Sequence, residues 1–108
     1  MAKFELNPGE TVIGKGQMAL HQKQYLNTRP ISGHVYVTDQ RACFYVTLLG
    51  MGTMEMDLPL AEIKGFSVKK ALITTVTIHS KAGESYVFTG FPSKKLQEWL
   101  RQVGVSEI

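Results

Sequence analysis

The chain has 108 residues, with twelve Lys or Arg against nine Asp or Glu, a formal charge of +3 and an isoelectric point near 9.1. This length predicts one domain over residues 1–108, whose core can bury roughly two-thirds of the unfolded surface. The single cysteine, Cys43, excludes an intramolecular disulfide and favours a reducing, cytoplasmic setting. Because no segment approaches the roughly 20 apolar residues that span a bilayer, and the charge falls short of most nucleic-acid binders, we expect a soluble or peripheral protein without a nucleic-acid partner.

Alternating apolar and polar residues predict about seven β-strands between residues 10 and 90. In the first strand, Met18 and Leu20 share the inner face and Lys15 lies on the other. The stretch "HQKQYLNTRPIS" breaks the alternation at Pro30, so we expect a loop or a frayed strand end there.

The stretch "GHVYVTDQRACFYV" predicts a β-hairpin with its turn at Asp39. One face carries apolar residues that point to the core: Val35, Val37, Ala42 and Phe44. The other, outward face carries His34, Tyr36, Cys43 and Tyr45. Arg41 is interpreted as a turn residue that pairs with Asp39, with no functional role.

Met51 lies in a turn between two glycines, and we expect this turn to be buried rather than to form an exposed apolar tip. Further strands are expected after it. Strict alternation from Met54 to Leu60 gives the clearest strand pattern in the chain. The β-branched stretch "ALITTVTIHS" predicts another strand, with Leu72, Val76 and Ile78 on one face, and "YVFTGF" predicts the last.

A helix is predicted at about residues 93–103, where the apolar residues are spaced by three and four: Leu96, Trp99, Leu100 and Val103. Ser93 is the expected N-cap and Gly104 the expected stop. The elements together predict a strongly curved antiparallel sheet whose open end is covered by this helix. We expect Trp99 to fill that opening.

Neither a metal site nor an active site is expected, and no cofactor is implied. His21, His34, His79 and Cys43 show none of the paired spacings that zinc ligands adopt. His34 is the one candidate base across the strand from Cys43, but an exposed sheet face provides no cleft that excludes water. The interpretation is therefore a non-catalytic binding module.

Four segments, "LNPGETVI", "GHVYVTDQRACFYV", "LPLAEIKGFSV" and "SKKLQEWL", give the sequence a family likeness over nearly its whole length. It resembles a GRAM domain of the pleckstrin-homology-like superfamily. The resemblance implies a mainly β barrel of about seven antiparallel strands in two nearly orthogonal sheets, capped by one C-terminal α-helix. It also implies binding or scaffolding, often at membranes, rather than catalysis.

Two binding hypotheses follow, and protein interaction or self-assembly is the favoured one. It uses the outward face with His34, Tyr36 and Tyr45 as the interface. The alternative is that these tyrosines form a second packing layer under the "HQKQYLNTRP" loop.

In the second hypothesis, Lys15, Lys23 and Arg29 form a basic mouth for a phosphoinositide-like lipid head group, as the resemblance suggests. The favourable pattern places a further basic pair early in the second strand, where this chain has "ISGHVYV". Three surface cations contribute about 3 kcal/mol at an anionic membrane, below the roughly 4 kcal/mol of a millimolar complex. Their alternative interpretation is solvated surface.

Overall fold

The computed structural model describes residues 4–24 and 27–108, except for the side chains of residues 22–24 and 27–29. Its elements are β1 (Val12–Gln24), β2 (Asn27–Thr38), β3 (Arg41–Leu48), β4 (Met51–Pro59), the 3-10 turn η1 (Leu60–Glu62), β5 (Ile63–Lys69), β6 (Thr75–Ser80), β7 (Ser85–Thr89) and α1 (Ser93–Gln102). Neither described helix is long and apolar enough to cross a membrane.

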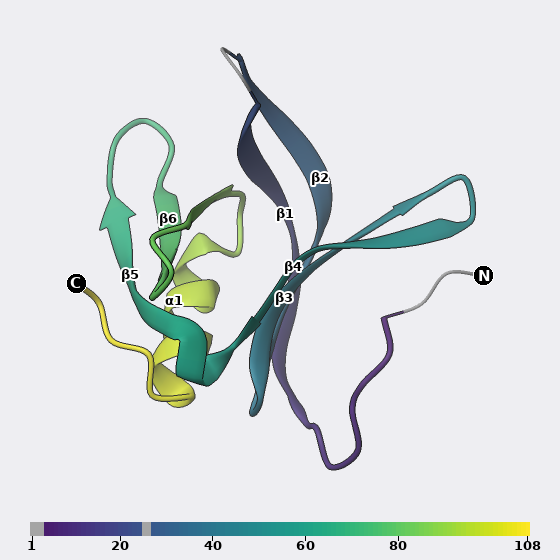
Figure 1. Ribbon diagram of the computed structural model, residues 1–108. Helices are drawn as coiled ribbons and strands as arrows, with labels where there is room; N and C mark the ends of the chain where they lie inside the picture. Colours follow the sequence, from purple (N-terminus) through teal and green to yellow (C-terminus); the bar gives the residue numbers. More distant parts are fainter. Residues whose placement is uncertain (1–3, 25–26) are drawn as a thin grey trace.

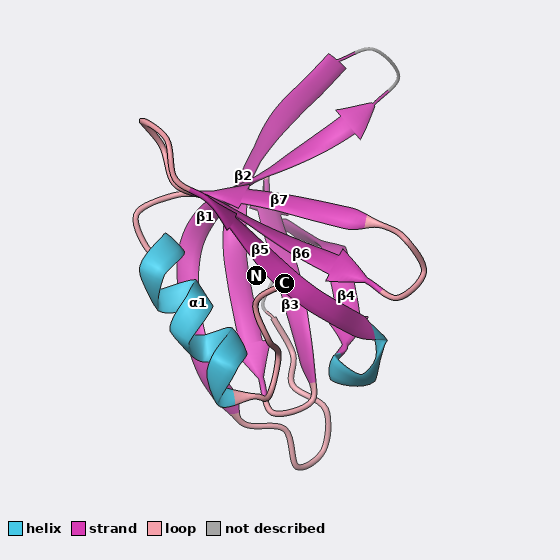
Figure 2. Cartoon of the chain, turned by 90° about the vertical axis from the view of Figure 1, so that its left-hand side faces the viewer, coloured by secondary structure: helices cyan, strands magenta, loops and turns pink. Residues whose placement is uncertain are grey.

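The seven strands form one antiparallel sheet in the order β4-β3-β2-β1-β7-β6-β5. β1 joins the two halves of this sheet, because it pairs with β2 along most of its length and with β7 at Ala19–His21. Figure 1 shows the halves diverging, with α1 between β5–β6 and β1–β2, and Figure 2 shows α1 alongside β1. The seven antiparallel strands and the C-terminal helix are confirmed, whereas two separate sheets are not, since hydrogen bonds continue through β1.

The hairpin of β1 and β2 is longer than the sequence predicts. Pro30 lies inside β2, opposite His21, in a stretch for which a loop or frayed end was expected. Proline lacks an N–H donor, so it is tolerated where one side of a strand has no partner. The pairing of β2 with β3 covers His34–Val37, which leaves Pro30 outside it. That part of the prediction is therefore wrong.

The core lies between the concave side of the sheet and α1. Phe44 and Phe88 are fully buried with ring centroids 5.5 Å apart, and Phe66 is fully buried as well. From α1, Leu96 and Leu100 are fully buried. The predicted inward residues of the central hairpin are all buried: Val35, Val37, Ala42 and Phe44.

Trp99 is only partly buried, so the leucines of α1 fill the opening in its place. The indole lies against β1 at Gly14, where an added Cβ would sit 2.1 Å from the ring. The glycine therefore leaves the space in which the helix approaches the strand.

Candidate functional site

A buried ion pair ties the segment before β1 to the central hairpin. Arg41 donates from Nε to Glu10 Oε2 at 2.8 Å and from Nη2 to Glu10 Oε1 at 3.1 Å. Its Nη1 also reaches Asp57 Oδ2 at 3.1 Å. Because Arg41 and Thr38 donate hydrogen bonds to its carboxylate against the opposing effect of burial, the pKa of Glu10 is lowered to about 2.

The prediction that Arg41 pairs with Asp39 is wrong. Asp39 instead accepts a hydrogen bond from the backbone N–H of Thr11 at 2.9 Å. Arg41 lies under the N-terminal segment, where its guanidinium is 5.1 Å from the centroid of the Phe4 ring and donates to the carbonyl of Glu5 at 2.9 Å. The buried pair therefore anchors the N-terminal segment across the outer side of the hairpin.

That N-terminal segment covers much of the predicted outward interface. Phe4 stacks on Tyr36 with centroids 4.0 Å apart and meets Tyr45 edge-on at 6.0 Å. Both tyrosines are half-buried, whereas His34 is exposed. The predicted second packing layer is present, but it lies under residues at the start of the chain. The use of His34, Tyr36 and Tyr45 as an interface stays a prediction.

Cys43 lies on this side of the hairpin and is fully buried. Its thiol donates to Asp57 Oδ1 at 3.6 Å. Burial raises the pKa of the thiol to about 12 despite the opposing charge of Arg41. A thiol with such a pKa is a poor source of thiolate near neutral pH.

The histidines with side-chain partners contact hydroxyl groups. His21 Nε2 lies 2.8 Å from Thr89 Oγ1, and His79 lies between Ser67 and Ser85 at 2.8 and 3.2 Å. In the part of the chain that the structure describes, no three His, Cys, Asp or Glu residues are grouped so as to hold a metal ion.

The three residues of the predicted basic mouth lie on the β1–β2 hairpin. Lys15 is exposed and pairs in register with Tyr36. Lys23 pairs with Thr28, and Arg29 with Gln22, towards the hairpin tip. The side chains of Lys23 and Arg29 lie outside the described part, so the lipid site built on them stays a prediction.

The loop that precedes β6 and the loop that follows β7 together carry an exposed apolar surface. Leu72 and Phe91 are fully exposed, and Ile73 is 64% exposed. They line one hollow of about 520 Å³ together with Thr74, Thr89, Gly90 and Ser93. We name this surface, with Leu72, Ile73 and Phe91 as its apolar members, the loop face.

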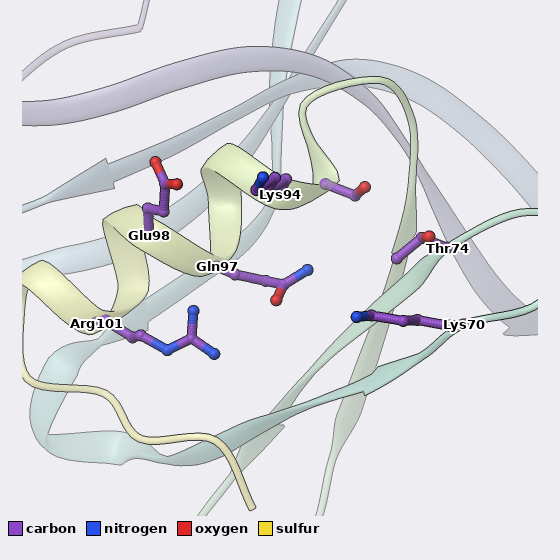
Figure 3. A pocket seen from close by; sticks show the side chains of 7 residues that line it. Lys70, Thr74, Lys94, Gln97, Glu98 and Arg101 are labelled. Carbon is purple, nitrogen blue, oxygen red and sulfur yellow. The ribbon is translucent and has the colours of Figure 1, made fainter.

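A basic hollow of about 310 Å³ adjoins the loop face and shares Thr74 and Ser93 with it. Figure 3 shows Lys70, Gln97 and Arg101 pointing into the space between α1 and the end of β5, whereas Glu98 points away. Lys94, in the first turn of α1, completes the cationic lining. Apolar and cationic side chains are therefore neighbours on one side of the molecule.

This surface was not predicted, because the β-branched pattern groups Leu72 in one strand with Val76 and Ile78. β6 begins only at Thr75, which leaves Leu72 in the preceding loop. The dipeptide Lys69-Lys70 directly before three apolar residues was the available sign of a basic and apolar loop.

A second exposed apolar surface lies at the tip of the β3–β4 hairpin, which extends away from the β5–β6 loop in Figure 1. Met51 is 73% exposed, so the buried turn expected there is wrong. Leu48 and Leu49 are exposed as well, and Leu49 has a φ of 52°. A leucine in the left-handed region is uncommon, because its Cβ is strained there.

Comparison with known proteins identifies the family. The sequence profile of the GRAM domain matches residues 1–102. The chain is similar to the C-terminal domain of an unknown protein from Leishmania infantum, at 17% identity and a TM-score of 0.64 over 89% of this chain and 86% of that one. No curated protein sequence matches the chain.

Pleckstrin-homology domains are also similar in structure. The Slm1 PH domain in complex with inositol-4-phosphate aligns at 19% identity and a TM-score of 0.58, covering 86% of this chain and 93% of that one. The PH domain of human pleckstrin homology domain-containing protein family A member 5 aligns at 10% identity and a TM-score of 0.59, covering 95% and 82%. The fold is PH-like, and the chain belongs to the GRAM domain family.

Proposed function

We propose that this chain is a non-catalytic binding module that docks on anionic membranes through the loop face and the basic hollow. The family and fold support a binding role. The observation that carries the membrane partner is the exposure of Leu72, Ile73 and Phe91 beside Lys70 and Lys94. Apolar side chains flanked by cations match the two layers of an anionic bilayer surface, acyl chains beneath charged head groups.

The magnitudes favour the loop face over a purely basic site. Each large apolar side chain contributes roughly 1.5–3 kcal/mol when fully buried, and each cation near an anionic surface about 1 kcal/mol. Three apolar residues and two lysines give a gross contribution of about 6.5–11 kcal/mol before the cost of association. Three cations alone give about 3 kcal/mol. Burial of the three apolar side chains therefore contributes more to the free energy of membrane binding than the cations do.

The basic hollow supplies a site for a phosphate group on the lipid. Lys70 and Arg101 point into it as donors, although Arg101 Nη2 is already bonded to Glu107 Oε1 at 2.8 Å. Thr74 and Ser93 add hydroxyls at its border with the loop face. The Slm1 PH domain has been solved with inositol-4-phosphate and with phosphoserine, which supports this ligand chemistry in the same fold.

Co-sedimentation with vesicles tests the proposal, using phosphatidylcholine alone and mixed with phosphatidylserine or phosphatidylinositol 4-phosphate. We expect binding that needs the anionic lipid and persists near physiological salt. The double change Leu72→Ser and Phe91→Ser should abolish it, and Lys70→Glu with Lys94→Glu should weaken it strongly.

Lys15→Glu with Lys23→Glu is the matched control, because it reverses two charges on the β1–β2 hairpin. Loss of binding in this control with retention in the loop-face variant would contradict the proposal and favour the basic mouth. No binding of the unaltered chain to any anionic vesicle would also overturn it.

Self-association is the second candidate, favoured by the strained and exposed tip of the β3–β4 hairpin. Contiguous exposed apolar side chains, such as those of Leu48, Leu49 and Met51, mark interaction sites on protein surfaces. Leu49→Asn relieves the strain and removes the apolar contact, so it should lower the solution mass if copies associate through this tip. An unchanged mass in light scattering would remove this candidate.

A further inference from the structure

The last residues of the chain add a short strand to the outer edge of β5. Phe66 donates its N–H to the carbonyl of Ser106 at 3.1 Å, and its carbonyl accepts from the N–H of Ile108 at 2.8 Å. Glu107 thereby forms a parallel bridge with Phe66. Figure 1 shows the C-terminus beside β5. The edge of β5 is therefore already paired with one extended segment. The contacts of this segment indicate which contacts another extended peptide could make there.

Gly65 makes this approach possible. A Cβ added to Gly65 would lie 2.7 Å from the Ile108 side chain and 2.8 Å from the Ser106 carbonyl. Glycine within a strand often marks a place where another backbone comes close. Any side chain at this position would push the added segment away from β5.

Cationic side chains border the edge of β5. Arg101 of α1 donates from Nη2 to Glu107 Oε1 at 2.8 Å, and its guanidinium lies 5.3 Å from the centroid of the Phe66 ring. Lys64 and Lys70 are exposed along or just after β5. A segment with an acidic residue beside Arg101 complements this cationic border.

Residues 106–108 are bound to the edge of β5 weakly enough for another peptide to displace them. It consists of two backbone hydrogen bonds and an ion pair whose side chains are each about half exposed. Such contacts contribute only about 1 kcal/mol each or less. Val105, just before the tail, is buried and bonded to Leu100, so it can stay in place when the tail leaves.

A segment that extends along β5 beyond the position of Ile108 would gain contacts in addition to those that residues 106–108 make. Alternate residues of a strand present their N–H and C=O groups to the same edge, so Val68 faces this edge as Phe66 does. Among the described residues, no strand pairs with Val68 on that side. A peptide that runs past Phe66 to Val68 could form two further backbone bonds.

We propose that the outer edge of β5, beside α1, binds an extended acidic peptide of a partner protein, with an acidic residue followed by an aliphatic one, and that residues 106–108 are its resident occupant. Binding is by strand addition, in which backbone bonds give affinity and side chains give selectivity. The inference goes beyond membrane docking and does not rest on it.

The test is a titration of the nitrogen-15-labelled full chain, and of a variant that lacks residues 106–108, with an acetylated Ser-Glu-Ile-Thr-Ser peptide. We expect amide shifts centred on Gly65 to Val68, and about tenfold tighter binding by the shortened chain because its edge is free. A peptide with Lys in place of Glu should bind more weakly to both. A shortened chain that keeps its core spectrum and shows no shifts along β5 overturns the proposal.

Glu107→Gln in the full chain keeps the test decisive if the shortened chain unfolds. It removes the ion pair alone, so the peptide should bind about two- to fivefold more tightly, and unchanged binding contradicts the proposal. The variant with Leu72→Ser and Phe91→Ser should bind the peptide as the unaltered chain does. Failure of vesicle docking and failure of peptide binding are therefore distinguishable.

Discussion

Two regions of this molecule reverse the usual placement of residue types. At the β2–β3 turn, the charged Glu10 and Arg41 are buried, and at the loop face the apolar Leu72 and Phe91 are exposed. Throughout the described residues, every buried polar side-chain atom has a hydrogen-bond partner, so the buried charges are satisfied within the chain. The exposed apolar side chains have no such use in the fold. The first reversal therefore bears on stability, and the second is the basis of the proposed membrane docking.

The largest expected effect on stability is at the buried pair. Arg41→Ala leaves Glu10 as an unpaired buried charge and should cost about 3–5 kcal/mol of unfolding free energy. Arg101→Ala is the matched control, because its ion pair with Glu107 is half exposed and should cost about 0–1 kcal/mol. Urea unfolding measures both, and equal losses would contradict the assignment of Arg41 to the fold.

The contribution of the buried pair to the unfolding free energy should also depend on pH. The folded-state pKa of Glu10 is about 2, below its ordinary value of 4.5, so its contribution is complete above about pH 4.5. Stability from this group should be lost as the pH falls from about 4.5 to about 2. Glu10→Gln should flatten this part of the curve of unfolding free energy against pH. A curve of the same shape in the variant would show that other carboxylates cause the loss.

A smaller effect is expected where Phe4 covers the hairpin. Phe4→Ala removes the stack on Tyr36 and should cost about 0.5–1.5 kcal/mol beyond lost burial. It should also speed the reaction of Cys43 with a thiol reagent, because the N-terminal segment opens more often. Phe91→Ala is the aromatic control at the loop face, and it should leave that rate unchanged. Equal rates in both variants would mean that Phe4 does not guard the thiol.

The smallest effect on stability should accompany the largest effect on docking. Leu72→Ser with Phe91→Ser removes side chains that are already in solvent, so the unfolding free energy should change by no more than about 0.5 kcal/mol per site. A loss of several kcal/mol in the unfolding curve would show that these residues serve the fold, and the comparison with the buried pair would fail.

Local patterns predicted most of the fold. The two-residue period placed Val35 and Phe44 in the core, and the helical spacing placed Leu96 and Leu100 there. Arg41 was missed because Glu10 lies 31 residues before it, and no local pattern encodes such a contact. Leu72 was misassigned because β-branched residues follow it, and these favour strand without marking where the strand begins. The tail on β5 had no periodic pattern of its own.

Hydrogen exchange of the chain, with and without vesicles that contain phosphatidylserine, tests the membrane proposal most directly. We predict slower exchange on vesicles at residues 70–74 and 90–94, which carry the loop face and the first turn of α1, and unchanged exchange at the tip of the β3–β4 hairpin. Protection confined to the β1–β2 hairpin around Lys23 and Arg29 would contradict this assignment and place the membrane contact at the basic mouth.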